Sequence, residues 1–197
     1  MDELAKIAVI GGDGIGTEVI EEAIRVLEHL DARHGLDLSF ERLDLGAERY
    51  LRDGTTMPEE TMDRVRNEFD AVFLGALGDP RVPSNVHAKD ILLGMRFQLD
   101  LYINYRPIQL LDARYCPLKD KRPEDIDIIV FRENTEGLYT GIGGQFKRGT
   151  EDEVAMETEM NTRKGVERII RAAFAYADSH GRTSVCMSDK ANAMRHG

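Results

Sequence analysis

The chain has 197 residues, of which 42% are hydrophobic and 31% are charged, a balance typical of a globular protein rather than a disordered one. Its formal net charge of -10 argues against nucleic acid or a membrane-docking basic face as a partner. With only Cys116 and Cys186, no zinc-ligand spacing and no signal peptide or long apolar span, we expect a cytoplasmic protein with reduced thiols and no membrane contact.

The first half of the chain alternates apolar strands with amphipathic helices. We predict strands at 7–10, 36–40 and 71–74, and helices at 15–34, 46–52 and 58–68. Helical spacing of apolar residues marks the first helix, through Ile15, Val19, Ala23, Val26, Leu27 and Leu30. This order of elements predicts an α/β unit with a largely parallel sheet.

The second half begins after a loop at 75–89, which is rich in Gly, Pro and Asn and long enough to be functional. We then predict a helix at 91–99, an extended segment at 102–107, strands at 126–131, 154–160 and 183–187, and a strongly amphipathic helix around 166–177. The glycines at 141–144 predict a turn, and the strand predicted at 154–160 would return from it.

A glycine-rich turn, residues 11–16, follows the first predicted strand. It fails the dinucleotide-binding fingerprint, because the third glycine position falls on Thr17 and no acid clearly ends the next strand in the required role. It also lacks the Gly-Lys-Ser/Thr of a Walker loop. We therefore favour a tight strand-to-helix turn that needs positive φ angles over a phosphate cradle.

The strand at 126–131 runs directly into ionisable and hydrogen-bonding side chains at 132–139. Arg132 offers a planar fork of donors suited to a carboxylate, and Tyr139 offers a phenol that can give or take a proton. A rigid strand end can deliver such groups to a site. The alternative is an edge strand that ends in a solvated turn, with the ring of Tyr139 only packing.

Three more cationic side chains lie in or just after predicted elements. Arg96 and Arg106 could converge with Arg132 on a small polycarboxylate, or each could be a surface arginine in a weak ion pair. Lys190, after the last predicted strand, could be a desolvated base or a solvated loop lysine. Residue spacing leaves these alternatives open.

Five segments together resemble one enzyme family. They are Gly12-Asp-Gly-Ile-Gly16, Leu92-Leu93-Gly-Met-Arg96, Asn104-Tyr-Arg-Pro107, Arg132-Glu-Asn-Thr-Glu-Gly-Leu-Tyr139 and Asp189-Lys-Ala-Asn192. The five segments occur in the order found in one family and span essentially the whole chain. The chain therefore resembles the metal-dependent β-decarboxylating dehydrogenases, the isopropylmalate and isocitrate dehydrogenase family. The resemblance implies that family's non-Rossmann α/β fold, which accounts for the failed dinucleotide fingerprint. It also implies part of a large cofactor-side domain at 1–100, and part of a substrate and dimerisation domain at 101–197 with a dimerisation arm near 139–161.

The resemblance also implies roles for individual residues. By position, Arg96, Arg106 and Arg132 resemble the arginines that hold the substrate's carboxylates. Tyr139 resembles the acid that protonates the enol carbon after CO2 leaves. Lys190 resembles the lysine that reaches across a dimer interface and takes the hydroxyl proton.

Two further sets are implied around these groups. Leu92 and Leu93 would face the part of the substrate that varies within the family. The residues implied for contact with a nicotinamide cofactor are Gly75, Ala76, Leu77, Gly78, Asp79 and Asn192.

The reaction implied by the resemblance is an NAD- or NADP-dependent oxidative decarboxylation of a 2-hydroxy acid, assisted by Mg2+ or Mn2+. The apolar Leu92 and Leu93 favour an alkyl substituent, and so 3-isopropylmalate of leucine biosynthesis. D-malate, tartrate and isocitrate stay open, because Lys89 replaces the glutamate usual in isopropylmalate enzymes and Gly11 replaces the usual proline of the first glycine loop.

The family's metal-binding aspartates come from downstream of the segment around Lys190, and no remaining carboxylate cluster matches that role. We therefore expect no metal ligands here, an N-terminal fragment that is inactive alone, and a homodimer acting on a small 2-hydroxy dicarboxylate when complete. The alternative of another class is a non-catalytic binding or assembly partner.

Overall fold

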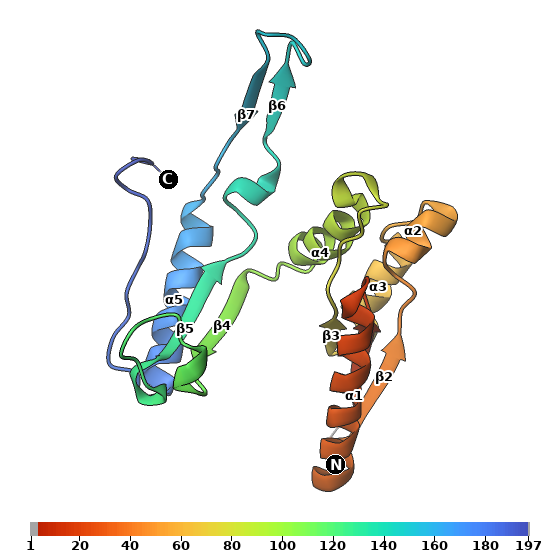
Figure 1. Cartoon of the computed structure of the whole chain (residues 1–197), viewed down its shortest axis with the longest axis vertical. Helices are drawn as coiled ribbons and strands as arrows, with labels where there is room; N and C mark the ends of the chain where they lie inside the picture. The colour runs from red at the N-terminus through yellow and green to blue at the C-terminus, as the bar shows by residue number, and fades with distance from the viewer. Residues whose placement is uncertain (1–3, 197) are drawn as a thin grey trace. The chain divides into compact units, whose positions relative to one another are not determined.

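The computed structural model describes residues 4–196, which form two compact units that meet in the chain between Leu99 and Asp100 (Figure 1). The first unit contains three strands and four α-helices: β1 (Ala5–Ile10), α1 (Ile15–His34), β2 (Leu38–Arg42), α2 (Ala47–Asp53), α3 (Glu59–Glu68), β3 (Ala71–Leu74) and α4 (Val86–Gln98). Its strands form a parallel sheet in the order β2-β1-β3. The predicted α/β unit with a parallel sheet is therefore confirmed.

The core of the first unit lies on both faces of β1, as is usual for a central parallel strand. Ile10 packs with buried residues of α3 and α4, including Met62 and Ile91. Val9 faces the other way, toward Ile20 and Ile24 of α1. The sheet is thus covered by helices on both sides, and β1 is the most buried element of the unit.

The helix α1 turns a different face to the sheet from the one that its apolar spacing predicts. Ile20 and Ile24 are buried, whereas Ile15, Val19 and Val26 are exposed. The helix ends as predicted, because Gly35 adopts a left-handed conformation with φ of 63° and its N–H donates to the carbonyl of Asp31 at 2.7 Å.

The second unit contains two antiparallel strand pairs and one long helix: β4 (Ile103–Gln109), β5 (Asp127–Glu133), β6 (Gly143–Phe146), β7 (Val154–Glu157) and α5 (Arg163–Ser179). Figure 1 shows the β6–β7 hairpin projecting away from β4, β5 and α5. The hairpin falls inside the predicted arm, and its residues are exposed on both faces.

Aromatic side chains hold α5 against the β4–β5 pair. Tyr105 and Phe131 lie opposite each other in the strand register, with ring centroids 5.5 Å apart. Tyr176 of α5 completes the cluster, with its ring centroid 5.2 Å from that of Phe131. The helix therefore occupies one face of the strand pair. Because side chains alternate along a strand, the residues next to Tyr105 and Phe131 point to the opposite face.

Three element predictions are wrong. The glycine turn predicted at 141–144 is partly strand, because Gly143 and Gly144 belong to β6, and the chain reverses at 147–153 instead. The helix α4 begins at Val86, five residues before its predicted start, because Asn85 takes a left-handed conformation with φ of 48° that lets the helix begin inside the expected loop. Residues 183–187 form no strand, since no other strand in the described part of the chain runs beside them to share backbone hydrogen bonds.

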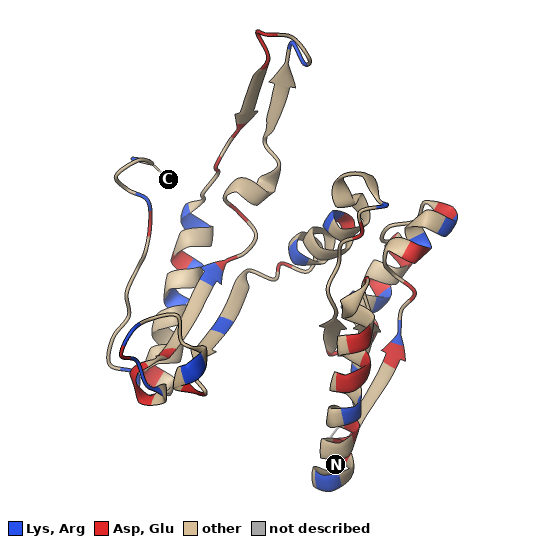
Figure 2. Cartoon of the chain, viewed as in Figure 1, with Lys and Arg blue, Asp and Glu red and all other residues tan. Residues whose placement is uncertain are grey.

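Charged residues of both signs are distributed along the helices (Figure 2). Exposed ion pairs connect many of them, as between Arg42 and Glu21 at 2.5 Å and between Arg171 and Glu167 at 2.6 Å. No helix among residues 4–196 is long and apolar enough to cross a membrane.

Candidate active site

The candidate active site of the second unit lies on the face of the β4–β5 pair that turns away from the aromatic cluster. Asn104 stands opposite Arg132 in the register, and Arg106 is two residues further along the same strand. Because side chains alternate along a strand, these three share one face. The local sequence thus places two of the predicted arginines on one surface.

Hydrogen bonds connect these residues into one polar network. Arg106 donates from Nε to Oδ1 of Asn104 at 2.5 Å, and Arg132 donates from Nη2 to the phenol oxygen of Tyr139 at 3.3 Å. The buried amide of Asn134 joins the two ends, because its Oδ1 lies 3.5 Å from both Asn104 Nδ2 and Arg132 Nη2. Arg106, Arg132 and Tyr139 are therefore brought together, as the resemblance implies.

The guanidinium of Arg132 has a donor that could serve a further hydrogen-bond acceptor. Its guanidinium lies over the ring of Tyr139, 5.3 Å from the ring centroid. Its Nε is buried and has no hydrogen-bond partner within residues 4–196. A buried donor left without a partner costs free energy, and a substrate carboxylate could accept from it.

A second cluster beneath the network fixes the turn that leads to Tyr139. The carboxylate of Glu133 accepts from the backbone N–H of Thr135 and of Glu136, each at 2.8 Å, and from the Thr135 hydroxyl at 2.6 Å. Burial alone would raise the pKa of Glu133, but these hydrogen bonds and one from Arg168 outweigh it and hold that pKa below its usual range. The turn is therefore fixed by a charged side chain.

The backbone completes the placement of Tyr139. Gly137 has a φ of 75°, which few residues other than glycine adopt readily. Its N–H donates to the carbonyl of Met160 at 2.8 Å, so the turn is tied to the base of the hairpin. Tyr139 follows in a short 3-10 turn, Leu138–Thr140.

Lys190 and Asn192 are exposed and lie near the end of the second unit. They belong to an exposed turn at residues 190–194, in which the carbonyl of Lys190 accepts from the N–H of Met194 at 2.8 Å. A cavity of about 540 Å³ between α5, β5 and residues 185–194 is lined by both Arg132 and Lys190. Tyr139 does not line it, so the two residues expected to handle protons are not brought to one cavity.

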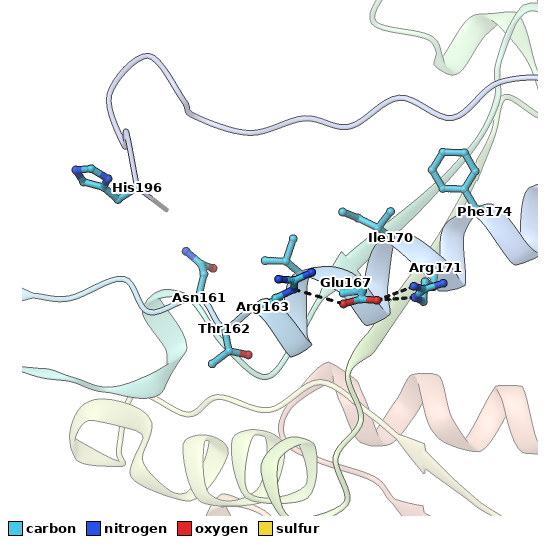
Figure 3. Close-up of a pocket in the computed structure, with 9 residues that line it drawn as sticks. Asn161, Thr162, Arg163, Glu167, Ile170, Arg171, Phe174 and His196 are labelled. Carbon is cyan, nitrogen blue, oxygen red and sulfur yellow. Dashed lines mark hydrogen bonds and ion pairs between the residues drawn. The ribbon is translucent and has the colours of Figure 1, made fainter.

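A larger hollow of about 690 Å³ runs along the exposed face of α5 and is shown in Figure 3. Glu167 lies at its centre and pairs with Arg163 at 3.9 Å and with Arg171 at 2.6 Å. It contains none of the predicted catalytic, substrate-binding or cofactor-binding residues, and its one carboxylate, that of Glu167, is already shared by two arginines.

The loop predicted to contact a cofactor belongs to the first unit and packs on the glycine turn. The N–H of Gly75 donates to the carbonyl of Ile10 at 2.8 Å, and the carbonyl of Ala76 accepts from the N–H of Asp13 at 2.7 Å. Further along, hydrogen bonds from the side chain and the backbone N–H of Arg81 lower the pKa of Asp79 to about 2. Residues 75–79 are therefore held by backbone contacts rather than left free, and Leu77 packs against the core.

The glycine turn is of the predicted kind. Gly12 has a φ of 78° and Gly14 a φ of 49°, so both need the conformational freedom of glycine. Gly16 is required for another reason, because a Cβ there would lie 2.7 Å from the backbone nitrogen of Ala76. The glycines of this turn thus allow the loop at 75–79 to pack closely against it.

Other predicted residues of the first unit lie on α4. Arg96 is buried, Leu92 is exposed and Leu93 is half-buried. Since Arg96 and Arg106 belong to different units, the convergence of the three arginines stays a prediction.

Sequence reasoning missed the polar residues that support these sites. Asn134 lies within a quoted motif and could have been suspected from it. Asp13 and His87 form a buried pair, with His87 Nε2 2.7 Å from Asp13 Oδ2, although they are 74 residues apart in the chain. No local pattern could have paired them.

A metal site does not take shape in residues 4–196. These contain no group of three or more His, Cys, Asp or Glu residues that could hold an ion. Hard divalent cations need several oxygen ligands, so the described residues do not fit such an ion on their own.

Comparison with known proteins gives the family. The model of the family described as isocitrate/isopropylmalate dehydrogenase matches residues 6–197. The chain belongs to this family. The resemblance drawn from the five motifs is therefore confirmed.

Individual members of the isocitrate/isopropylmalate dehydrogenase family agree with this assignment. The chain is 49% identical over 178 residues to a 3-isopropylmalate dehydrogenase of Bifidobacterium longum, covering 90% of this chain and 50% of that protein. It is 48% identical over 193 residues to the enzyme of that name from Corynebacterium efficiens, covering 98% and 54%. The chain thus spans about half the length of the curated relatives it matches.

Solved structures of the family share the fold. An isocitrate dehydrogenase from Methylococcus capsulatus matches with a TM-score of 0.82 and 33% identity, covering 98% of this chain and 53% of that one. A β-decarboxylating dehydrogenase from Thermococcus kodakarensis matches with a TM-score of 0.61 and 34% identity, covering 90% and 46%. The expected isocitrate/isopropylmalate dehydrogenase-like α/β fold is confirmed.

Proposed function

We propose that this chain carries the substrate-binding part of an NAD- or NADP-dependent enzyme that oxidatively decarboxylates a 2-hydroxy acid, and that the acid is 3-isopropylmalate. The observation that carries the proposal is the hydrogen-bonded network of Arg106, Arg132 and Tyr139 on one exposed face of β4 and β5. It combines two carboxylate-binding cations with one proton donor. Family membership and the names of the relatives support the same reaction.

In this proposal the network binds and orients the substrate. Arg132 and Arg106 neutralise its carboxylates, and the unpartnered Nε of Arg132 accounts for one of the new hydrogen bonds. Tyr139, held against Arg132, returns a proton to the carbon from which CO2 has left. Lys190 takes the proton of the hydroxyl group, and Arg96 supplies a third cation.

A nicotinamide cofactor would accept the hydride, and residues 75–79 together with Asn192 would hold it. The backbone of this loop is fixed by contacts with the glycine turn, which suits a surface on which a flat ring is positioned. The described residues offer no ligand set for Mg2+ or Mn2+, so no step is assigned here to a metal.

The choice of 3-isopropylmalate rests on an apolar lining. Leu92 and Leu93 precede Arg96 on α4 and would face the alkyl group of this substrate, whereas a third carboxylate would lack a partner there. D-malate has no such alkyl group and is the second candidate. We further propose a homodimer in which the β6–β7 hairpin takes part, because both of its faces are exposed.

The test uses the protein isolated from its own organism, here called the native-source protein. Reduction of NAD or NADP is followed with 3-isopropylmalate, D-malate, tartrate and isocitrate, each in the presence of Mn2+. The expected result is the highest kcat/KM with 3-isopropylmalate. Faster turnover of isocitrate would contradict the choice of substrate, and no turnover of any of the four would contradict the reaction.

Binding to the 197-residue chain itself can be tested separately by NMR. Titration with 3-isopropylmalate is expected to shift the side-chain signals of Arg106 and Arg132, and Arg132→Lys is expected to weaken this response. Arg114, which is exposed and paired with Asp112 at 2.7 Å, provides the control signal.

A further inference from the structure

We infer that Asp13 and His87 form a buried latch that positions the loop 76–79 against the glycine turn, and that they are positioning residues of the candidate cofactor site. Asp13 belongs to the glycine motif and His87 to the first turn of α4. Neither is used by the proposed reaction. The inference rests on the proposed function only for what the loop binds.

Asp13 is the common acceptor of three separate segments. Its Oδ1 accepts from the N–H of Ala47 at 2.6 Å, at the start of α2. Its Oδ2 accepts from the N–H of Gly78 at 2.7 Å and from Nε2 of His87 at 2.7 Å. One carboxylate thus joins the glycine turn to α2, to the loop and to α4.

Burial makes this arrangement costly to break. The side chain of Asp13 is 3% exposed and that of His87 is fully buried. A buried carboxylate that lost one of its donors would carry charge without full compensation. Burial on its own would raise the pKa of Asp13, but the hydrogen bonds from Ala47, His87 and Gly78 outweigh it and hold that pKa below its usual range.

The geometry also fixes the proton on His87. An ionised carboxylate only accepts, so Nε2 must carry the hydrogen. Nδ1 is buried and has no hydrogen-bond partner within residues 4–196. The ring of Tyr50, on α2, stacks beside the imidazole at 6.2 Å between centroids, so the imidazole is confined from the side as well as through Nε2.

The loop depends on this latch for its shape. Gly78 has a φ of 147°, a conformation that is poorly suited to other residues, and the hydrogen bond to Asp13 holds it there. Two residues earlier, the carbonyl of Ala76 accepts from the N–H of Asp13 itself at 2.7 Å. The side chain and the backbone of Asp13 thus fix the two ends of the segment 76–78.

Amide hydrogen exchange on the 197-residue chain, without cofactor, tests the latch. His87→Leu removes the donor at similar volume, and we expect exchange in residues 76–85 to accelerate by about tenfold or more. His87→Gln keeps a donor at the position of Nε2 and is expected to restore protection. Ile24→Leu, a buried substitution in the separate cluster between β1 and α1, is the matched control and should leave these residues unchanged.

Each other outcome counts against the latch. Unchanged exchange in His87→Leu, or equal acceleration in His87→Gln, would overturn it. Acceleration spread evenly over β1, β3 and α1 would assign the pair to the core rather than to the loop. Imidazole nitrogen shifts give a second readout: a ring protonated on Nδ1 and bare on Nε2 would also overturn the assignment.

Kinetics of the native-source protein separate the latch from the proposed function. We expect His87→Leu to raise the KM for NAD more than it lowers kcat, with the KM for the 2-hydroxy acid little changed. If the loop loosens but the KM for NAD stays the same, the latch stands and the role of residues 75–79 in cofactor binding fails.

Discussion

The guanidinium of Arg132 lies 5.3 Å from the ring centroid of Tyr139 and donates a hydrogen bond to its phenol oxygen at 3.3 Å. A cation over the ring and at the hydroxyl group places the side chain proposed to bind a carboxylate in direct contact with the proposed proton donor. The two side chains can therefore act on neighbouring atoms of one small substrate, and substitutions can separate their contributions.

Tyr139→Phe keeps the ring under Arg132 and removes the hydroxyl group, which is the proposed proton donor and also accepts a hydrogen bond from Arg132. In the native-source protein we expect kcat to fall by about 10²- to 10⁴-fold, with little change in KM, because general acid catalysis is lost. In the proposed reaction hydride transfer precedes this step, so a burst of reduced nicotinamide should remain in rapid-mixing experiments. Tyr115→Phe, at an exposed position, is the control. Full turnover by Tyr139→Phe would remove Tyr139 from the mechanism.

Arg132→Lys keeps the charge and removes the planar fork of donors. We expect kcat/KM for the 2-hydroxy acid to fall by about 10- to 100-fold, the loss of one charge-assisted hydrogen bond. Arg114→Lys should leave kcat/KM unchanged. Equal effects of the two substitutions would show that only the overall charge matters.

Gly75→Ala tests the packing of the loop on the glycine turn. A Cβ at Gly75 would collide with the backbone carbonyl of Gly11, which cannot move aside as a side chain could. We expect a loss of about 3 kcal/mol in the free energy of unfolding, measured with urea. Gly94→Ala is the matched control, because a Cβ there would meet only Met62 Cε at 3.8 Å within a helix, and should stabilise by about 0.5–1 kcal/mol.

Thr162→Ala tests the start of α5. The Thr162 hydroxyl accepts from the N–H of Gly165 at 3.0 Å and donates to Glu136 at 2.5 Å, so it caps the helix and ties it to the candidate site. We expect the free energy of unfolding, measured with urea, to fall by about 1 kcal/mol, and amide exchange in the first turn of α5 to become faster. Thr183→Ala, at an exposed position, should change neither quantity.

Glu133 should make the second unit sensitive to acid. Its pKa is lower in the folded chain than the ordinary value of 4.5, so its stabilising contribution is present above that value and is lost as the pH falls through the folded-state pKa. Urea unfolding followed across this range is expected to show a decline in stability that Glu133→Gln flattens. Glu124→Gln, at an exposed position, should retain the decline.

Periodicity and turn chemistry were sufficient for most of the fold. The buried run at 7–10 and the glycine turn after it predicted β1 and the start of α1 correctly, because burial and positive φ leave strong local signals. The face of α1 and the start of α4 were missed, since both depend on what packs against them. A strand at 183–187 was predicted from composition alone, but a strand also needs a neighbour.

The candidate site likewise contains residues that the sequence predicted and residues that it did not. Arg106, Arg132 and Tyr139 were predicted as site residues from distinctive motifs in or just after extended segments, and the structure joins them in one hydrogen-bonded network. Asn134 joins them through tertiary placement. Asp13 and His87 could not be paired from the sequence, because buried partners far apart in the chain leave no periodic trace.

The distances along the chain between Asp13 and its donors also affect the order of folding. They are 34 residues to Ala47, 65 to Gly78 and 74 to His87. Closing such long segments costs conformational entropy. These contacts therefore form late in folding, once packing of the core offsets that cost. The loop at 76–79 should therefore be among the last parts of the first unit to reach its native shape during refolding, well after α1 has formed.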